Sequence, residues 1–220
     1  MKTHRTRRGG VARAIFHAAV IASLAVGGEA SSRPPAELAR ADSIVNVLPA
    51  DQRRTLAERK LLLLGKSEGA GAGLEALVIF AKPPDRVYRL LAQTDRAREY
   101  RPDLRAADTV ERNAAGPIDE QRMRILFRDI VYRLQFRLYP ERRSITWELA
   151  AGFDNDLEQA DGFWRLHPLP DGRTLGHFGT AVNIGPAFPI YLQKLVTRRK
   201  LPATIDRTRR WVDSAGVDRP

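Results

Sequence analysis

The sequence has 220 residues, with 37 Lys and Arg against 26 Asp and Glu, which gives a net charge of +11. It has no cysteine, so disulfides and thiol catalysis are excluded. The positive charge is compatible with an anionic membrane surface or with nucleic acid as a partner.

The first thirty residues have the pattern of an export signal. Five basic residues are followed by the apolar stretch 14–26 and by the small residues of 28–30. The apolar stretch is shorter than the roughly 20 residues of a membrane-spanning helix. Without residues 1–30 the chain keeps 32 basic and 25 acidic residues, a charge of +7. We expect an exported, periplasmic or secreted protein. The alternative is an inner-membrane anchor formed by an uncleaved N-terminal segment.

The segment after this signal is expected to be a linker followed by a folded domain. Residues 31–48 begin Ser-Ser-Arg-Pro-Pro and show no sustained period, which predicts a linker that is partly helical around 36–41. Helix-start residues at 49–51 predict a short helix over about 50–59. The apolar run 61–64 and the stretch 73–82 predict two strands, with Leu77 and Ile79 facing one way.

Two short helices are expected next. Residues 83–85, Pro-Pro-Asp, begin the first, in which Val87, Leu90 and Leu91 form one apolar stripe. The second is expected over 94–100, where Thr and Asp supply capping side chains.

The middle of the chain alternates apolar and charged residues with the period of a strand, which sends successive side chains to opposite faces. The apolar set of one stretch is Tyr132, Leu134, Phe136 and Leu138, and the opposite set is Arg133, Gln135 and Arg137. The same alternation puts Ile145, Trp147 and Leu149 on one face, and Met123, Ile125 and Phe127 opposite Arg122, Arg124 and Arg128. These strands predict an antiparallel sheet with an aromatic-rich inner face.

Further strands are expected over 104–113, 119–128, 158–168 and 173–184. From residue 189 the period becomes helical, with one apolar side that includes Leu192, Leu195, Ile205 and Val212. Pro202 is expected to kink this long C-terminal helix.

This order resembles the helix-grip fold of the START-like superfamily, also called SRPBCC or polyketide cyclase/dehydrase and lipid transport proteins. The stretches that carry the resemblance are 81–91, 99–103, 162–172 and 188–204. The resemblance implies an α+β fold in which a curved antiparallel sheet wraps around a long C-terminal helix. It also implies an apolar cavity that holds lipids or polyketide-like molecules. The START-like domain would span 49–216, with 217–220 as a tail.

The resemblance places the apolar faces of the strands and of the last helix on the cavity wall. The candidate ligand-binding residues are Met123, Phe127, Tyr132, Phe136, Trp147, Trp164, His177, Leu192 and Leu195. Plain core packing is the alternative for each aromatic residue, because aromatic side chains usually fill cores.

His177 is the candidate catalytic residue. If Leu175 points inward, so does His177, and Gly179 on the same face leaves room around the imidazole for a general base. The alternative is a histidine that is hydrogen-bonded within the sheet or exposed at its edge. His167 is expected to face outward. No zinc-ligand spacing and no phosphate-binding glycine loop occurs, and the acids of 154–161 lack the spacing of a calcium loop, so no cofactor or metal is expected.

Three functions remain open. The first is a non-catalytic carrier or sensor of a lipid or other hydrophobic small molecule in the cell envelope. The second is a cyclase- or dehydratase-like enzyme that acts on a hydrophobic substrate, with His177 as acid or base. The third is an envelope interaction module whose basic surface contacts an anionic membrane. Nucleic acid is not expected as a partner, because an exported protein rarely meets it.

Overall fold

A computed structural model describes residues 41–65, 72–125, 128–185 and 200–216, all within one compact unit, Ala36–Pro220. The expected export signal, the first part of the expected linker and the expected tail lie outside the described residues. So do three of the candidate ligand-binding residues: Phe127, Leu192 and Leu195.

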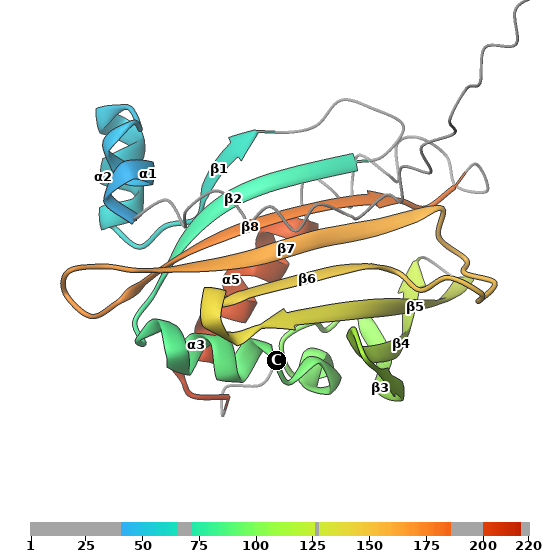
Figure 1. Ribbon diagram of the computed structural model, residues 1–220. Coiled ribbons are helices and arrows are strands. Elements are labelled where there is room, and N and C mark those ends of the chain that lie inside the picture. The colour runs from blue at the N-terminus through green and yellow to red at the C-terminus, as the bar shows by residue number, and fades with distance from the viewer. Residues whose placement is uncertain (1–40, 66–71, 126–127, 186–199, 217–220) are drawn as a thin grey trace, which may run out of the picture. The chain divides into compact units, whose positions relative to one another are not determined.

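The centre of the fold is an eight-stranded, curved antiparallel sheet with the order β1-β2-β8-β7-β6-β5-β4-β3 (Figure 1). The strands are β1 (Leu62–Gly65), β2 (Ala72–Phe80), β3 (Leu104–Asn113), β4 (Gly116–Ile125), β5 (Arg128–Tyr139), β6 (Ser144–Leu149), β7 (Gln159–Pro168) and β8 (Thr174–Asn183). The strands expected from the alternation are all present, although β4 begins three residues before the expected start of 119. The antiparallel sheet is therefore confirmed.

Short helices precede and interrupt the sheet, and one longer helix ends it. They are α1 (Ala41–Asn46), α2 (Ala50–Ala57), α3 (Pro84–Leu91), the 3-10 helices η1 (Thr94–Glu99) and η2 (Pro140–Arg142), and α5 (Leu201–Asp213). Both expected helices after β2 are present, the second as a 3-10 helix. Pro202 lies in the first turn of α5, where the missing amide donor has little effect on helix stability. The part of the expected long helix before residue 200 lies outside the described residues, so the expected kink stays a prediction.

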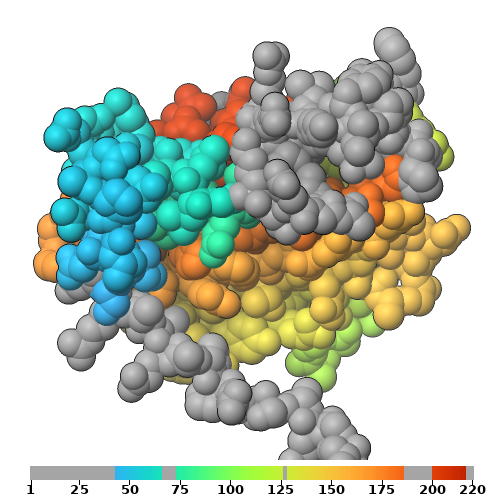
Figure 2. Space-filling view, turned by 90° about the horizontal axis from the view of Figure 1, so that it is seen from above, coloured from blue at the N-terminus to red at the C-terminus, as the bar shows by residue number. Residues whose placement is uncertain are grey.

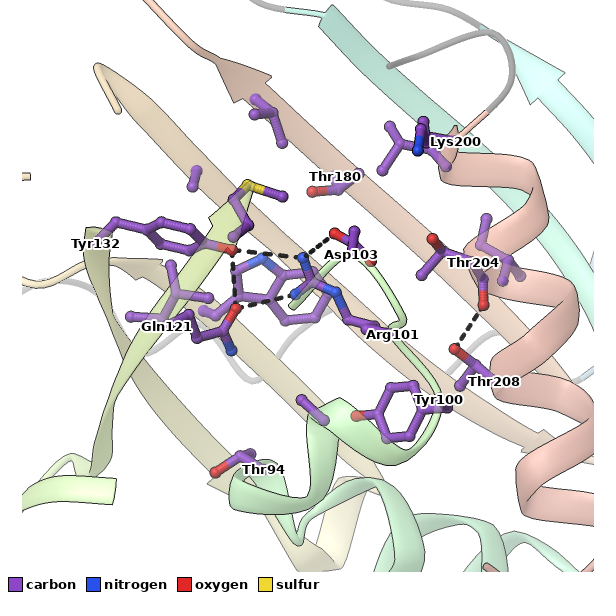
Figure 3. A pocket seen from close by; sticks show the side chains of 18 of the residues that line it. Thr94, Tyr100, Arg101, Asp103, Gln121, Tyr132, Thr180, Lys200, Thr204 and Thr208 are labelled. Carbon is purple, nitrogen blue, oxygen red and sulfur yellow. Dashed lines mark hydrogen bonds and ion pairs between the residues drawn. The ribbon is translucent and has the colours of Figure 1, made fainter. Parts of the chain in front are cut away.

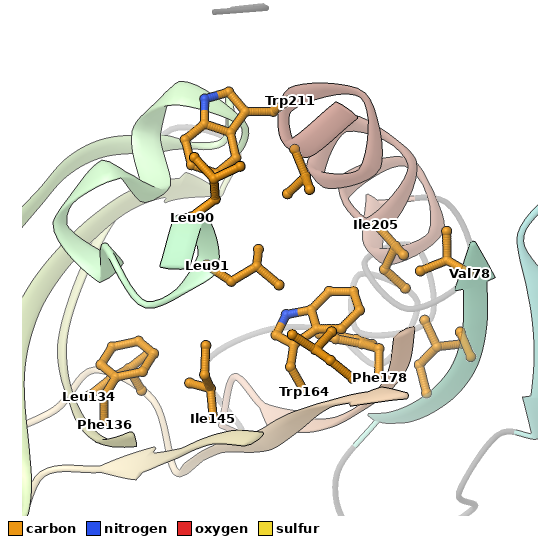
Figure 4. Close-up of a cluster of buried hydrophobic side chains, with 14 of the residues drawn as sticks. Val78, Leu90, Leu91, Leu134, Phe136, Ile145, Trp164, Phe178, Ile205 and Trp211 are labelled. Atoms are coloured by element: carbon orange, nitrogen blue, oxygen red, sulfur yellow. The ribbon is translucent and has the colours of Figure 1, made fainter. Parts of the chain in front are cut away.

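The concave face of the sheet, α3 and α5 enclose the main hydrophobic core. Tyr132, Leu134 and Phe136 are buried there, which confirms the face predicted for them from the alternation. Figure 4 shows side chains from the sheet, such as Ile145, pointing toward Leu91 of α3 and Ile205 of α5. The sheet thus grips the C-terminal helix, as the helix-grip prediction required.

The opposite, outer face of the sheet carries a second apolar cluster. Leu77, Ile79 and Leu175 are buried there together with Leu56 of α2 and Leu62 of β1. Ile44, Val45 and Leu48 also pack against this cluster, so α1 contributes to the fold although it lies within the segment expected to be a linker. Figure 2 shows α1 and α2 beside β1.

Side chains at the end of α5 bind to three other parts of the fold. Asp213 Oδ1 accepts a hydrogen bond of 2.7 Å from the amide of Ala81 at the end of β2, and Oδ2 pairs with Arg59, which follows α2. The indole of Trp211 donates a hydrogen bond of 3.1 Å to Glu99 at the end of η1. These contacts hold α5 across the concave face.

Within the described part of the chain, no helix combines the length and the apolar character needed to cross a membrane.

Candidate functional site

A cavity of about 390 Å³ lies between the concave face of the sheet, the η1 region and α5. Most of its wall is aromatic or aliphatic. Five of the candidate ligand-binding residues line it: Met123, Tyr132, Phe136, Trp147 and Trp164. The resemblance implied that these residues share a cavity wall, and their strands do lie in one sheet and present the same face.

The aromatic side chains of the wall contact one another at tilted angles. The ring centroids of Trp147 and Phe178 lie 5.9 Å apart, and those of Trp164 and Phe178 lie 4.7 Å apart. Tilted aromatic pairs at these distances are favourable beyond their buried area. Phe178 was not among the expected wall residues, although it follows the alternation of β8.

Glycines leave the space that these large rings occupy. A Cβ at Gly162 would collide with the ring of Trp147 and with the carbonyl oxygen of Gly179. A Cβ at Gly176 would lie 2.5 Å from Phe80 and 3.2 Å from Trp164. The position of both tryptophans therefore depends on the absence of a side chain in β7 and β8.

His177 does not line the cavity, and the expectation that it points inward was wrong. Its Nε2 lies 2.6 Å from Oε1 of Glu75, and its ring meets that of Phe163 edge-on, both on the outer face. Burial lowers its pKa, and Glu75 opposes that effect. His177 does share a face with Leu175, but Leu175 belongs to the outer cluster under α2. A general base for a substrate in the cavity is not supplied by His177.

His167 faces outward as expected, yet it is buried. Only 3% of it is exposed, and its Nε2 has no hydrogen-bond partner among the described residues. Burial, together with the charges of His177 and Arg165, lowers its pKa to about 4. The imidazole is therefore neutral at physiological pH.

One end of the cavity carries a polar cluster, of which only Tyr132 was expected from the sequence (Figure 3). The guanidinium of Arg101 donates to Oε1 of Gln121 at 3.0 Å, to the hydroxyl of Tyr132 at 3.4 Å and to Oδ2 of Asp103 at 3.3 Å. Tyr132 in turn donates to Gln121 at 2.9 Å. Arg101 and Asp103 follow η1, while Gln121 and Tyr132 lie opposite each other on β4 and β5.

The two tyrosines at this end are held in their neutral form. Burial raises the pKa of Tyr132, although Arg101 opposes the effect. Burial also raises the pKa of Tyr100 to about 12. Both phenols therefore keep their proton at neutral pH.

Comparison with known proteins agrees with this architecture. No family model matches the sequence, and no curated protein matches it. A solved structure of a protein from Thermus thermophilus matches with a TM-score of 0.56 and 18% identity, over 65% of this chain and 98% of the other. A START superfamily protein from Mycobacterium smegmatis matches with a TM-score of 0.54 and 16% identity, over 68% and 99% of the two chains.

A third match is the ZhuI aromatase/cyclase from Streptomyces sp. R1128, with a TM-score of 0.52 and 18% identity, over 66% of this chain and 97% of the other. The chain has a START-like fold. At these identities the likeness establishes the START-like architecture and leaves ligand and activity to the site itself.

Proposed function

We propose that this START-like protein binds one hydrophobic small molecule, a lipid or a polyketide-like compound, inside the cavity. The observation that carries the proposal is the cavity itself, about 390 Å³ with a mainly aromatic and aliphatic wall. Ligand pockets for small molecules have volumes of about 300–1,000 Å³ and are mostly apolar with a few polar groups. The ligand would contact Met123, Tyr132, Phe136, Trp147 and Trp164.

A carrier or sensor fits the site better than an enzyme. The histidine that the enzyme hypothesis requires, His177, lies on the outer face against Glu75. The polar cluster inside the cavity consists of Arg101, Asp103, Gln121 and Tyr132, which bind one another. Their mutual hydrogen bonds hold these side chains in position, which suits them to orienting a ligand. We therefore propose binding without chemical conversion.

The binding test uses N-phenyl-1-naphthylamine, an uncharged dye that fluoresces in apolar surroundings. Ala160 lies on β7, is buried and lines the cavity, so Ala160→Phe should fill part of the space. Ala151 is exposed in the turn after β6, and Ala151→Phe is the matched control. We expect the dye to bind wild type and Ala151→Phe equally and Ala160→Phe at least about tenfold more weakly. Equal binding by all three folded proteins contradicts the proposal.

We further propose that the protein is exported before it acts. The support is the signal-like pattern of residues 1–30. N-terminal sequencing of the protein from its native cells tests this: a chain that begins near residue 31 in the envelope or medium supports export, and an intact N-terminus in the cytosol contradicts it.

An anionic membrane surface is the partner that we propose for the basic outer surface near the β4–β5 ends. Arg124 forms a bidentate pair with Asp129 at 2.7 and 2.8 Å. The hydrogen bonds and charge of Arg124, and the charges of Arg122 and Arg105, lower the pKa of Asp129. Three exposed arginines thus share one acid, and the positive excess adjoins Met123 and Ile125 of the cavity wall. Basic residues near an anionic bilayer contribute about 1 kcal/mol each.

Vesicles that contain phosphatidylserine test the surface. Changing Arg105 and Arg122 to Gln should weaken binding about tenfold or more, and added salt should weaken wild-type binding. The control changes Arg53 and Arg54 of α2, which are also exposed, to Gln. Equal losses in both double variants show that net charge alone acts, and this contradicts the assignment of the surface.

A further inference from the structure

The polar cluster of Arg101, Asp103, Gln121 and Tyr132 lies at one end of the described cavity wall, and its charges are balanced. Arg101 carries a positive charge at all accessible pH values, and Asp103 supplies the matching carboxylate at 3.3 Å. Gln121 is uncharged, and Tyr132 keeps its proton because burial raises its pKa. The cluster therefore has no net charge at neutral pH.

Part of this cluster is open to a ligand. The side chains of Arg101 and Asp103 keep 24% and 20% of their surface accessible, and both line the cavity. Gln121 and Tyr132 are almost fully buried and accept hydrogen bonds from the Arg101 guanidinium (Figure 3). The guanidinium is thus fixed in position, which lowers the entropic cost of a hydrogen bond to a ligand.

A ligand anion is a poor match for this arrangement. It would lose its hydration on entering the cavity, which costs several kcal/mol unless an unpaired positive charge receives it. Arg101 is already paired, and the carboxylate of Asp103 would lie beside the incoming anion and repel it. An uncharged oxygen can accept from the guanidinium without either cost.

We infer that the end of the ligand that reaches Arg101 is uncharged and carries an oxygen acceptor, such as a hydroxyl or a carbonyl, and that Asp103 sets this preference against acids. The inference rests on the proposed function, since it concerns a ligand of the same cavity. It narrows the hydrophobic ligand to neutral alcohols, phenols, ketones or esters at this end and excludes fatty acids bound with their carboxylate at Arg101.

Among the described residues, two further cations line the cavity, and a test has to separate their effect on ligand binding from that of Arg101. Arg124 is paired with Asp129 at 2.7 Å. Lys200 is exposed at the start of α5, away from Gln121 and Tyr132 (Figure 3). An anionic ligand in the reverse orientation would reach Lys200, so the test is made in the Lys200→Gln background as well as in the wild-type chain.

The experiment measures by calorimetry the affinities for 2-naphthol and 2-naphthoate, which share two rings and differ in charge. Asp103→Asn removes the negative charge and keeps an oxygen for Arg101. Asp171→Asn is the control, because Asp171 pairs with Arg173 in the β7–β8 turn. The parent protein is either the wild-type chain or the Lys200→Gln chain. We expect each parent, and its Asp171→Asn variant, to bind 2-naphthol more tightly than 2-naphthoate. In Asp103→Asn the ratio should shift at least about tenfold toward 2-naphthoate, because the unpaired Arg101 then receives the anion.

Two results overturn the inference while the proposed function stands. One is tighter binding of 2-naphthoate than of 2-naphthol by the Lys200→Gln parent, and the other is an unchanged ratio in folded Asp103→Asn. Asp103→Ala replaces Asp103→Asn if circular dichroism shows that the Asn variant is unfolded, and the same shift is expected. If the folded parent binds neither compound, the result contradicts both the proposed function and this inference.

Discussion

Tyr132 donates a hydrogen bond of 2.9 Å to Oε1 of Gln121, and the same oxygen accepts a hydrogen bond of 3.0 Å from Arg101. This buried acceptor joins β4, β5 and the segment after η1 at one end of the cavity. It therefore links the stability of the fold to the position of the guanidinium.

Tyr132→Phe should lower the free energy of unfolding by about 1 kcal/mol. The variant removes one of the two hydrogen bonds that Oε1 of Gln121 accepts, and it removes one acceptor of the Arg101 guanidinium. Tyr139→Phe is the control, since Tyr139 is 36% exposed at the end of β5 and should change stability by less than about 0.5 kcal/mol. Urea unfolding measures both. Equal stability of the two variants would show that the hydroxyl of Tyr132 is not needed.

Gly162→Ala should destabilise the fold by about 1–3 kcal/mol and weaken ligand binding, because the new Cβ displaces Trp147 from the cavity wall. Gly65→Ala provides the comparison: no atom of the described residues lies within 4 Å of a Cβ there, so little change is expected. Thermal unfolding and dye binding measure the two effects. A Gly162→Ala protein with wild-type binding would mean that Trp147 does not shape the cavity.

His167 should make the fold sensitive to acid. Its pKa is lowered from 6.5 to about 4 in the folded state, mainly by burial, so the unfolded state binds the proton more tightly. Stability is then fully present above pH 6.5 and is lost as the pH falls toward 4, by about 3 kcal/mol. His167→Met should remove this loss. The measurement is urea unfolding of both proteins at several pH values, and parallel curves for the two would contradict the assignment.

Asp119 should change the pH dependence of stability in the direction opposite to His167. Burial raises its pKa above 3.8, although hydrogen bonds from Thr94 and Thr109 oppose the shift. The folded state therefore binds the proton more tightly, and stability rises as the pH falls through the folded pKa toward 3.8, below which there is no further gain. Relative to Asp119→Asn, wild type should become more stable over this window. A constant difference between the two proteins from pH 7 to 3.8 would show that Asp119 titrates normally.

The succession of strands along the chain follows from the sequence, and so does the inner face of β5 and β6, because the side chains of these two strands alternate between apolar and polar. The polar residue Gln121 also follows this alternation, two positions before Met123, and the period alone would have placed it on the inner face. Arg101 has no such signal. It lies after η1, where no period applies, and reaches Gln121 and Tyr132 only through the fold.

His177 shows why one apolar position does not identify the inner face. The alternation correctly put His177 and Leu175 on the same side of β8. However, this sheet is apolar on both sides at that position, because α2 covers Leu175 on the outer face with Leu56. The helical stretch expected around 36–41 did not include residues 42–46 of α1 for a related reason. Ile44 and Val45 are too short an apolar run to show a helical period before their packing surface is known.

The most direct test of the account is native mass spectrometry of the protein purified from its own cells, followed by extraction with organic solvent. We predict one bound hydrophobic molecule per chain in the wild type and none in Ala160→Phe, in which the cavity is partly filled. A wild-type mass that equals the bare chain, together with no thermal stabilisation by neutral hydrophobic compounds, would contradict ligand binding in the cavity.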